Sequence, residues 1–467
     1  MKNLAAVVLA AGKGTRMKSE KPKVLHIVAG KPMLFFPVNL LKNSGAGKIV
    51  LVVGFGSEAV VEAFKDYGLS FVTQEEQLGT GHAVSCALKE LRDFTGDVLV
   101  LSGDVPLIRE ETVKALLDLH RKGAKAKAAI SLVTTVVENP KGYGRIVRDA
   151  DGEIIRIVEE KDCSPLQRKI QEVNTGIYLF SASFLHANIK KLGKENAQGE
   201  YYLPDLVHLA VGEGLRVDSI STLDATEVMG VNNRVELAIA GEHMRARINE
   251  ALMVSGVTII DPRATYVDFG VAVGVDTVIY PGVRLTGATV IGAKCVIEEG
   301  SVITSSKVGD GSAIKSYSVI EDSEVGKENA IGPFARLRPK TILADKVRIG
   351  NFVEVKKSSL GKGSKANHLT YLGDSVIGEG VNIGAGTITC NYDGTNKSVT
   401  TIEDGAFIGS DSQLIAPVTV GKGAYVGSGT TVTKNVPAGS LVITRAPEKV
   451  IEGWAGRKFK GKGKEKE

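Results

Sequence analysis

The first half of the chain alternates short apolar runs with amphipathic stretches. Residues 5–10, 49–53 and 98–101 form continuous aliphatic runs, which are typical of strands buried on both faces of a sheet. Between such runs, residues 111–120 repeat their apolar positions with the spacing of one helical face. Strand and helix in alternation predict βαβ units and a mostly parallel sheet, so we expect an α/β domain over residues 1–231.

A different period governs the second half of the chain. Aliphatic residues recur at every sixth position, with few skips, from Val273 to Val432. This period is the hexapeptide signature of a parallel β-helix, in which each flat face supplies one inward side chain and three faces close a coil. We therefore predict a β-helix over residues 254–450. The spacing fails between Thr389 and Ile402, where we expect a loop extruded at a binding face.

The segments that flank the β-helix are predicted from helical spacing and charge. Residues 232–253 carry apolar positions at helical spacing and are predicted to form one long helix, either a bridge between the halves or the last helix of the first domain. Residues 451–467 end in a lysine-rich run. We expect a partly disordered, solvated tail there rather than a nucleic-acid-binding segment.

Composition narrows the class of protein. Of the 467 residues, 43% are hydrophobic and 24% are charged, which is ordinary for a folded protein, and no stretch approaches the roughly 20 apolar residues of a membrane helix. The net charge of +5 is small for this length and indicates neither a nucleic-acid nor a membrane partner. The four cysteines are far apart in sequence, which argues against a disulfide framework or a zinc knuckle. We expect a cytoplasmic protein without a signal peptide.

A glycine-rich turn follows the first predicted strand. Residues 9–17 read Leu-Ala-Ala-Gly-Lys-Gly-Thr-Arg-Met, so backbone N–H groups can approach a phosphate while Arg16 adds charge. The turn matches neither the Walker loop nor the dinucleotide-binding fingerprint. Taken alone, it is as compatible with a plain tight turn as with a phosphate site. Lys23, in the sequence Lys-Pro-Lys-Val-Leu that follows, offers a second phosphate contact.

A carboxylate stands at the end of another predicted buried strand. Asp104 closes the sequence Leu-Val-Leu-Ser-Gly-Asp at residues 99–104, and ligands of open α/β sheets bind at the carboxyl ends of strands. A strand-end aspartate near phosphate-binding lysines suits Mg²⁺, which takes a few carboxylates together with phosphate oxygens. The alternative is that Asp104 only caps the turn after the strand.

The β-helix carries a second group of polar residues. Arginine and lysine in the stretches 334–339 and 351–357 suit a sugar phosphate, and His368 is followed by Tyr371 and by the predicted loop. A histidine can remove a proton at neutral pH, as an amine that attacks a thioester requires. A lone histidine is more often a surface or structural imidazole, but the polar surroundings of His368 favour a general base.

These motifs together resemble a bacterial family of bifunctional enzymes, in which N-acetylglucosamine-1-phosphate uridylyltransferase is joined to glucosamine-1-phosphate N-acetyltransferase. The resemblance continues through Gly-Tyr-Gly-Arg-Ile at 142–146, Val-Glu-Glu-Lys at 158–161, Asn-Thr-Gly at 174–176 and Gly-Val-Asn-Asn-Arg at 230–234, and it covers nearly the whole chain. It implies a Rossmann-like nucleotidyltransferase domain followed by a left-handed β-helix that assembles as a homotrimer.

For the first half, the resemblance implies a site for UTP, a sugar phosphate and Mg²⁺. Arg16 and Lys23 would neutralise the phosphates during catalysis, while Asp104 and Asn232 would bind the metal. The residues implied to hold UTP or the UDP-N-acetylglucosamine product are Leu9, Ala10, Ala11, Gly12, Lys23, Gln74, Gly79, Thr80, Ser102, Gly103, Asp104, Gly144, Glu159, Asn174 and Asn232.

For the second half, the resemblance implies acetyl transfer from acetyl-CoA to glucosamine 1-phosphate. His368 would be the base, oriented by Glu354. The residues implied to bind the two substrates are Arg338, Lys356, Tyr371 and Asn382 for the amino-sugar phosphate, and Ala385, Asn391, Tyr392, Ser410, Ser428 and Arg445 for acetyl-CoA.

The two activities would be consecutive, since the acetylated product is the acceptor for uridylyl transfer, and the nucleotide sugar would supply peptidoglycan and lipopolysaccharide. One alternative is a monofunctional nucleotide-sugar pyrophosphorylase, of the ADP-glucose or GDP-mannose type, whose β-helix is structural or regulatory. Another is a regulatory subunit without chemistry. Gln74 and the His368–Tyr371 pair argue against the first alternative, and Arg16 and Asp104 argue against the second.

Overall fold

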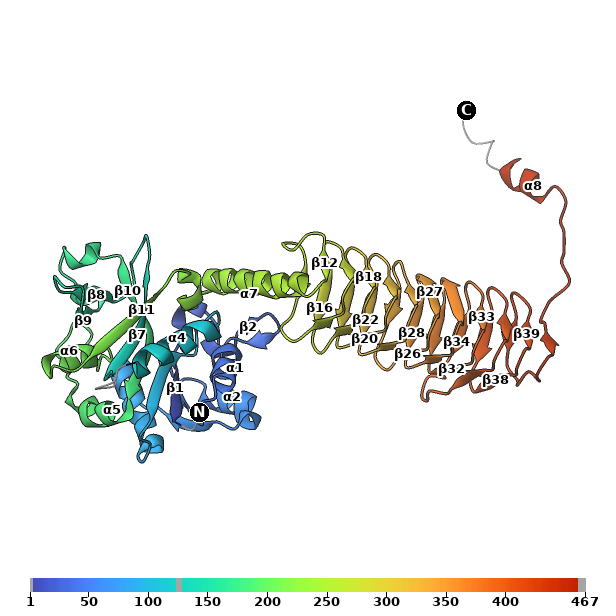
Figure 1. Cartoon of the computed structure of the whole chain (residues 1–467). Coiled ribbons are helices and arrows are strands. Elements are labelled where there is room, and N and C mark those ends of the chain that lie inside the picture. The colour runs from blue at the N-terminus through green and yellow to red at the C-terminus, as the bar shows by residue number, and fades with distance from the viewer. Residues whose placement is uncertain (1–2, 123–127, 461–467) are drawn as a thin grey trace. The chain divides into compact units, whose positions relative to one another are not determined.

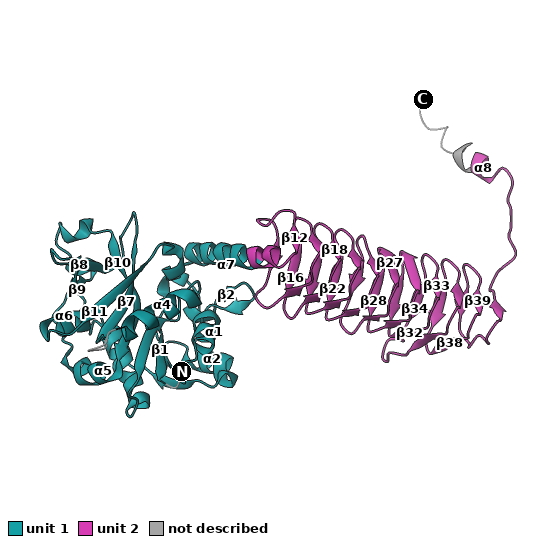
Figure 2. Cartoon of the chain, viewed as in Figure 1, with its two compact units in different colours: residues 1–248 teal, residues 249–467 magenta. Residues whose placement is uncertain are grey.

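The chain folds into two compact units. The computed structural model describes residues 3–122 and 128–460. The first unit comprises residues 1–248 and the second comprises residues 249–467 (Figure 2).

A nine-stranded mixed sheet forms the centre of the first unit (Figure 1). Its strands are β1 (Leu4–Ala10), β4 (Lys48–Val53), β5 (Ser70–Thr73), β6 (Asp97–Ser102), β7 (Ile130–Val136), β8 (Arg145–Arg148), β9 (Ile154–Val158), β10 (Glu172–Ser181) and β11 (Val217–Thr222). The main path runs β11-β7-β10-β6-β1-β4-β5, and β8 pairs with β10 and β9. Strands β6, β1, β4 and β5 are parallel, as the βαβ pattern predicts, whereas β10 runs antiparallel to β6 and β7.

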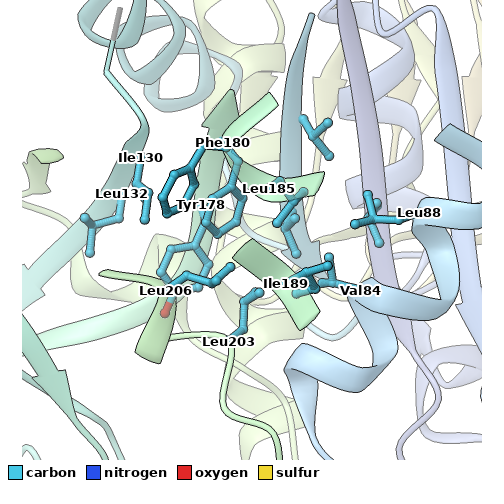
Figure 3. Close-up of a cluster of buried hydrophobic side chains, with 14 of the residues drawn as sticks. Val84, Leu88, Ile130, Leu132, Tyr178, Phe180, Leu185, Ile189, Leu203 and Leu206 are labelled. Atoms are coloured by element: carbon cyan, nitrogen blue, oxygen red, sulfur yellow. The ribbon is translucent and has the colours of Figure 1, made fainter. Parts of the chain in front are cut away.

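Helices cover both faces of this sheet. They are α1 (Phe35–Asn43), α2 (Ser57–Phe64), α3 (Thr80–Ala87), α4 (Glu110–Arg121), α5 (Ala182–Asn188) and α6 (Asp205–Gly212). Alternating side chains of β1 separate the two cores: Ala5 and Val7 pack with α3, α5 and α6, whereas Ala6 and Val8 pack with α1, α2 and α4. Figure 3 shows the first of these cores, around Tyr178. Burial on both faces explains why β1 is a continuous apolar run.

A long helix, α7 (Arg234–Val254), lies where the sequence predicted a helix over 232–253, and the division between the units falls inside it. Its C-terminal part is anchored to the start of the β-helix. Asn249 is fully buried and donates hydrogen bonds from Nδ2 to the carbonyl oxygens of Pro262 and Thr265, at 2.8 and 3.0 Å. The helix therefore contributes residues to both units.

Three parallel sheets form the second unit (Figure 1). They hold 11, 10 and 9 strands, from β12 (Thr258–Ile259) to β41 (Leu441–Val442), and each strand pairs with the strand one coil later. In regular coils the step is 18 residues, as from Ile279 to Ile297, which corresponds to three hexapeptides. The inward aliphatic side chains are buried, apart from Val273 in the first coil and Val442 in the last strand, which are half-buried. The predicted parallel β-helix is therefore confirmed.

Two segments depart from the regular coils. The predicted loop is present, and within it Tyr392 and Lys397 form an isolated antiparallel bridge. After β41 the chain is exposed as far as the short helix α8 (Trp454–Lys460), and the remainder of the predicted tail, residues 461–467, lies outside the described residues. Neither α7 nor any other helix in residues 3–122 and 128–460 combines the length and apolarity needed to cross a membrane.

Candidate active sites

The first candidate site is a cavity of about 500 Å³ at the carboxyl edge of the parallel strands. Strands β1, β5 and β6 run in the same direction, so the turns that follow them meet at one edge of the sheet. The residues singled out from the sequence that line the cavity are Leu9, Ala10, Ala11, Gly12, Lys23, Gln74, Gly79, Thr80, Ser102, Asp104, Gly144, Glu159 and Asn174.

Four polar side chains converge where β6 ends. The ammonium group of Lys23 forms an ion pair with Asp104 and donates a hydrogen bond to Oδ1 of Asn232, 3.2 Å away. Asn232 is brought there by the backbone, because the N–H of Val231 donates to the carbonyl of Asp104 at 2.9 Å. The hydroxyl of Ser102 donates to the other carboxylate oxygen of Asp104 at 2.5 Å. One carboxylate oxygen of Asp104 and the amide oxygen of Asn232 therefore both contact the ammonium group of Lys23.

Arg16 and Gly103 lie away from the cavity wall. Arg16 is exposed on the short 3₁₀-helix η1 (Thr15–Met17), directly after the glycine-rich turn. The N–H of Gly103 donates to the carbonyl of Leu9 at 2.9 Å, and a Cβ at this glycine would lie 2.8 Å from Leu34. Gly103 therefore permits close packing behind the cavity. The structure does not bring the Arg16 side chain to the wall, so its role at the phosphates stays a prediction.

Residues from β10 and from the ends of the β8–β9 hairpin form another part of the wall. Oδ1 of Asn174 accepts a hydrogen bond from the hydroxyl of Tyr178 at 2.8 Å, and the N–H of Asn174 donates to the carbonyl of Gly144, also at 2.8 Å. A Cβ at Gly144 would lie 3.0 Å from a carboxylate oxygen of Glu159. Burial raises the pKa of Glu159, and repulsion from Asp162 adds to the rise. Oδ1 of Asn174 also accepts from the N–H of Gly176 at 3.1 Å, so this part of the wall offers the Glu159 carboxylate as an acceptor and the Asn174 NH₂ group as a donor. Both suit the hydroxyl groups of a sugar.

Gln77 and Tyr143 are among the polar residues of the wall that had no role predicted from the sequence. Gln77 donates from Nε2 to the carbonyl of Ala11 at 2.7 Å. It lies in a loop without periodicity, so no spacing signal marked it. Tyr143, whose pKa is raised by burial, stands in the Gly-Tyr-Gly-Arg-Ile motif, which was the available signal.

The second candidate site surrounds His368 on the β-helix. His368 is exposed at the end of β30 (Lys365–His368), and its Nδ1 lies 3.1 Å from Oδ1 of Asn351, its partner in register on the neighbouring strand. Glu354 instead accepts a hydrogen bond from Nη1 of Arg338 at 2.9 Å. Glu354 lies on another of the three sheets, so within one chain the structure brings His368 to Asn351 and not to Glu354. Among the described residues, no hydrogen bond or ion pair joins Glu354 to His368, so the orienting role of Glu354 stays a prediction.

Basic residues gather around a buried aspartate that the sequence reasoning missed. Asp374 forms ion pairs with Lys356 at 3.2 Å and Lys357 at 3.3 Å and accepts a hydrogen bond from the amide of Asn391. Burial alone would raise the pKa of Asp374, but these three donors hold it below its usual value. The side chain of Lys397, in the extruded loop, lies close enough to Lys356 to lower the Lys397 pKa. Asp374 thus joins a predicted phosphate-binding lysine to the predicted acetyl-CoA loop.

Three predicted acetyl-CoA residues form a column on the β-helix. Ala385, Ser410 and Ser428 each stand two residues after the inward aliphatic residue of successive coils in one sheet. The carbonyl of each earlier member accepts from the residue that follows the next member: Ala385 accepts from the N–H of Asp411 at 2.6 Å, and Ser410 accepts from the N–H of Gly429 at 2.8 Å. The column therefore places small side chains along one corner of the β-helix.

The remaining predicted residues of the second unit are spread over its surface. Tyr371 is half-buried, in register with Glu354. Asn382 is half-buried in the same sheet as His368, while Tyr392 is exposed in the loop and Arg445 is exposed after the last strand. Among the described residues, no hydrogen bond joins any of these four to the imidazole.

Comparison with known families assigns each unit to a class. Residues 5–224 match the family described as Nucleotidyl transferase, residues 267–360 match the GMPPB C-terminal domain, and residues 400–434 match the Bacterial transferase hexapeptide (six repeats). Together with the strand-end cavity and the β-helix, these matches define the class of protein as a nucleotidyltransferase joined to a hexapeptide-repeat transferase.

Similar proteins extend along nearly the whole chain. The Bifunctional protein GlmU of Geotalea daltonii is 55% identical over 97% of this chain and 99% of its own length. Those of Geobacter sulfurreducens and a Geobacillus species are 51% and 50% identical, over 98% and 97% of this chain and 99% and 97% of their own lengths. The chain belongs to the bifunctional GlmU family.

Membership of this family decides between the alternatives left open by the sequence. The chain is an enzyme with uridylyltransferase and acetyltransferase activities, and its β-helix is left-handed, as the resemblance implied. The monofunctional alternative and the regulatory-subunit alternative gain no support, because the bifunctional relatives match through both units.

Proposed function

We propose that the two units catalyse consecutive steps in the synthesis of UDP-N-acetylglucosamine. This nucleotide sugar is the precursor of peptidoglycan and lipopolysaccharide. The second unit transfers an acetyl group from acetyl-CoA to glucosamine 1-phosphate. The first unit then transfers the uridylyl group of UTP to N-acetylglucosamine 1-phosphate and releases pyrophosphate. The observation that carries the proposal is that Asp104 and Asn232 both contact the ammonium group of Lys23, which lines the cavity with Asp104, in a chain whose β-helix presents His368.

In the first unit, the proposed roles follow from the chemistry of the wall. Lys23, together with Arg16 from the exposed turn, neutralises phosphate charge. Glu159 accepts hydrogen bonds from the sugar, and Asn174, whose Oδ1 already accepts from Tyr178 and Gly176, donates from Nδ2. An oxygen of the sugar phosphate attacks the α-phosphorus of UTP, and the bond to pyrophosphate breaks. No general base is needed because a sugar phosphate is anionic at neutral pH. Positioning and charge stabilisation therefore supply most of the rate.

The donor set at the end of β6 fits Mg²⁺. A carboxylate of Asp104 and the amide oxygen of Asn232 both reach the ammonium of Lys23, so they can reach a common cation. Mg²⁺ takes one or two protein oxygens and completes its shell with phosphate and water. The described residues contain no group of three or more His, Cys, Asp or Glu side chains that could hold a metal, which fits a site shared with the substrate. When bound, Mg²⁺ supplies positive charge that stabilises the phosphates.

In the second unit, Asn351 sets the tautomer of the proposed base. Its amide oxygen can only accept, so Nδ1 of His368 carries the hydrogen and Nε2 keeps its lone pair. Nε2 takes a proton from the amine of glucosamine 1-phosphate as the nitrogen attacks the thioester carbon. The carbon–sulfur bond then breaks, and CoA leaves with a proton as its thiol. Arg338 and Lys356 hold the phosphate, and the column of small residues holds acetyl-CoA.

We further propose that the β-helix assembles as a homotrimer with acetyl-transfer sites between subunits. The dispersal of the predicted residues supports this, because Tyr392 and Arg445 are exposed and make no hydrogen bond to His368 within one described chain. Light scattering should give a mass three times the 49.4 kDa of the chain. A monomer with full acetyltransferase activity would rule the arrangement out.

The proposed compartment is the cytoplasm, where both UTP and acetyl-CoA are available. All four cysteines are free thiols in the structure, which fits a reducing environment. Fractionation of the native cell should recover both activities with the cytoplasmic contents, and recovery from the extracellular medium would contradict the assignment.

A coupled assay tests the proposed function. Formation of UDP-N-acetylglucosamine should require glucosamine 1-phosphate, acetyl-CoA, UTP and Mg²⁺, each omitted in turn. Asp104→Asn should abolish uridylyl transfer and leave acetyl transfer near the wild-type rate. His368→Ala should lower acetyl transfer by about 10² to 10⁴, the usual contribution of an acid–base group, and leave uridylyl transfer unchanged. Equal loss of both activities in a folded variant would contradict the assignment of sites.

A further inference from the structure

The side chain of Gln74 is held by two neighbours at the entrance to α3. Gln74 follows β5, is 5% exposed and lines the cavity. Its Nε2 lies 3.1 Å from the carbonyl oxygen of Gly79 and 3.1 Å from Nδ1 of His82, which stands in the first turn of α3. His82 has no role in the site described above.

These two contacts determine which way the amide faces. A carbonyl oxygen can only accept, so the atom of Gln74 beside the Gly79 carbonyl must be the NH₂ group. That group has two hydrogens, and the second one points to His82, so Nδ1 of the ring must act as the acceptor. The ring hydrogen then lies on Nε2, which is 3.7 Å from Sγ of Cys86 and can donate to it. All three contacts are satisfied by one neutral tautomer of His82.

The other end of the amide is left for a ligand. Both hydrogens of Gln74 are used within the protein, and among the described residues no hydrogen bond is made to its Oε1. The wall of the cavity at Gln74 therefore presents an acceptor and no donor from this side chain. The family resemblance implies that the uracil edge of UTP lies at Gln74. Uracil carries a hydrogen on ring nitrogen N3, whereas the corresponding nitrogen of cytosine is itself an acceptor.

We propose that His82 is a positioning residue that sets the base selectivity of the uridylyltransferase. It locks the amide of Gln74 with its oxygen toward the base, so that uracil gains a hydrogen bond and cytosine meets two opposed acceptors. This inference rests on the proposed function of the cavity. It adds a specific cause for the choice of UTP over CTP. Gln74 alone would not make this choice, because a free glutamine amide could turn to present its NH₂ group to cytosine.

Substitutions at His82 test the proposal through the ratio of kcat/KM for UTP to that for CTP. His82→Leu keeps the size and the helix propensity but removes the acceptor, so the ratio should fall about tenfold or more, because a site built around a hydrogen bond discriminates strongly. His82→Asn places a carbonyl oxygen near the position of Nδ1 and should restore most of the ratio. Cys86→Ala removes only the partner of Nε2 and should leave the ratio within about twofold of the wild type.

The chain supplies its own control for folding. Acetyl transfer should stay at the wild-type rate in all variants, and His82→Ala repeats the comparison in case leucine disturbs the packing of α3. A wild-type enzyme that prefers UTP, with the same preference in His82→Leu and His82→Ala, would overturn the role of His82 and leave the proposed function standing. A wild-type enzyme that uses CTP as well as UTP would overturn the proposed base site itself.

Discussion

At the scale of single residues, Glu159 lies in surroundings that disfavour the ionised form of its carboxyl group. Burial raises the pKa of its carboxyl, repulsion from Asp162 and Asp205 adds to the rise, and attraction to Arg145 only partly offsets it. A carboxyl whose pKa is higher in the folded state stabilises the protein below its unfolded-state pKa, and this contribution is lost as pH rises through the folded-state value. At neutral pH the ionised group therefore lowers stability, as binding groups often do.

Glu159→Gln should separate the effect of this charge on stability from its effect on catalysis. At pH 7 the variant should unfold at a higher temperature than the wild type, because the neutral amide is easier to bury. At pH 4, where the wild-type carboxyl is protonated, the two melting temperatures should agree. The kcat/KM for N-acetylglucosamine 1-phosphate should fall about tenfold, since a charged acceptor is lost. Calorimetry at the two pH values and a uridylyltransferase assay make the measurement.

A matched control is Glu153→Gln, at an exposed position of the β8–β9 hairpin. It should change neither the melting temperature nor the rate. A lower melting temperature for Glu159→Gln at pH 7 would show that the charge of Glu159 is compensated in the folded protein.

At the scale of elements, the β-helix depends on how closely successive coils approach one another. Gly350 lies in the strand that ends at Asn351, and a Cβ added to it would overlap the carbonyl oxygen of Asn367 in the next coil. Asn351 is the partner of the His368 imidazole. The spacing of these two coils therefore bears on both the stability of the β-helix and the position of the proposed base.

Substituting alanine for glycine should have opposite effects in the two kinds of element. Gly350→Ala should destabilise the second unit by about 1–3 kcal/mol, the usual cost of overpacking, and should lower acetyl transfer by moving Asn351. Gly241→Ala, on α7, meets nothing within 4 Å and should stabilise the protein by up to about 1 kcal/mol. Denaturant titration of both variants measures whether the free energy of unfolding falls for Gly350→Ala and rises for Gly241→Ala, and acetyltransferase assays measure the rate. An unchanged midpoint for Gly350→Ala would mean that the coils can separate at little cost.

At the scale of the whole molecule, the two proposed sites draw on separate sets of residues. The cavity is lined by residues of the first unit, and the surroundings of His368 belong to the second. Neither chemistry requires a group from the other set. The product of acetyl transfer can therefore reach the first unit through solution.

Mixing two inactive variants tests this independence. Asp104→Asn and His368→Ala should each fail to make UDP-N-acetylglucosamine from glucosamine 1-phosphate at a normal rate. Equal amounts of both should restore its formation after a lag, during which free N-acetylglucosamine 1-phosphate accumulates. Chromatography of the reaction over time follows both compounds. Absence of product from the mixture, with each partial activity intact, would show that the intermediate must pass directly between the units of one assembly.

The sequence by itself determined the features that depend on local periodicity. A six-residue period is a property of consecutive residues, so it identified the β-helix, and the break in that period located the loop around Tyr392. Continuous apolar runs likewise identified strands such as β1, and the end of a strand marked Asp104 as a residue near a ligand. These inferences needed no knowledge of which strands are neighbours.

The tertiary structure alone decided which side chains meet. The register of two coils joins His368 to Asn351 rather than to Glu354, and the buried Asp374 ties Lys356 to Asn391 across coils. The orientation of the Gln74 amide likewise depends on a turn and a helix that fold back beside it. Such contacts depend on distances of about 3 Å between particular atoms. The period of the sequence gives the order of the coils, but it does not give which side chains approach one another that closely.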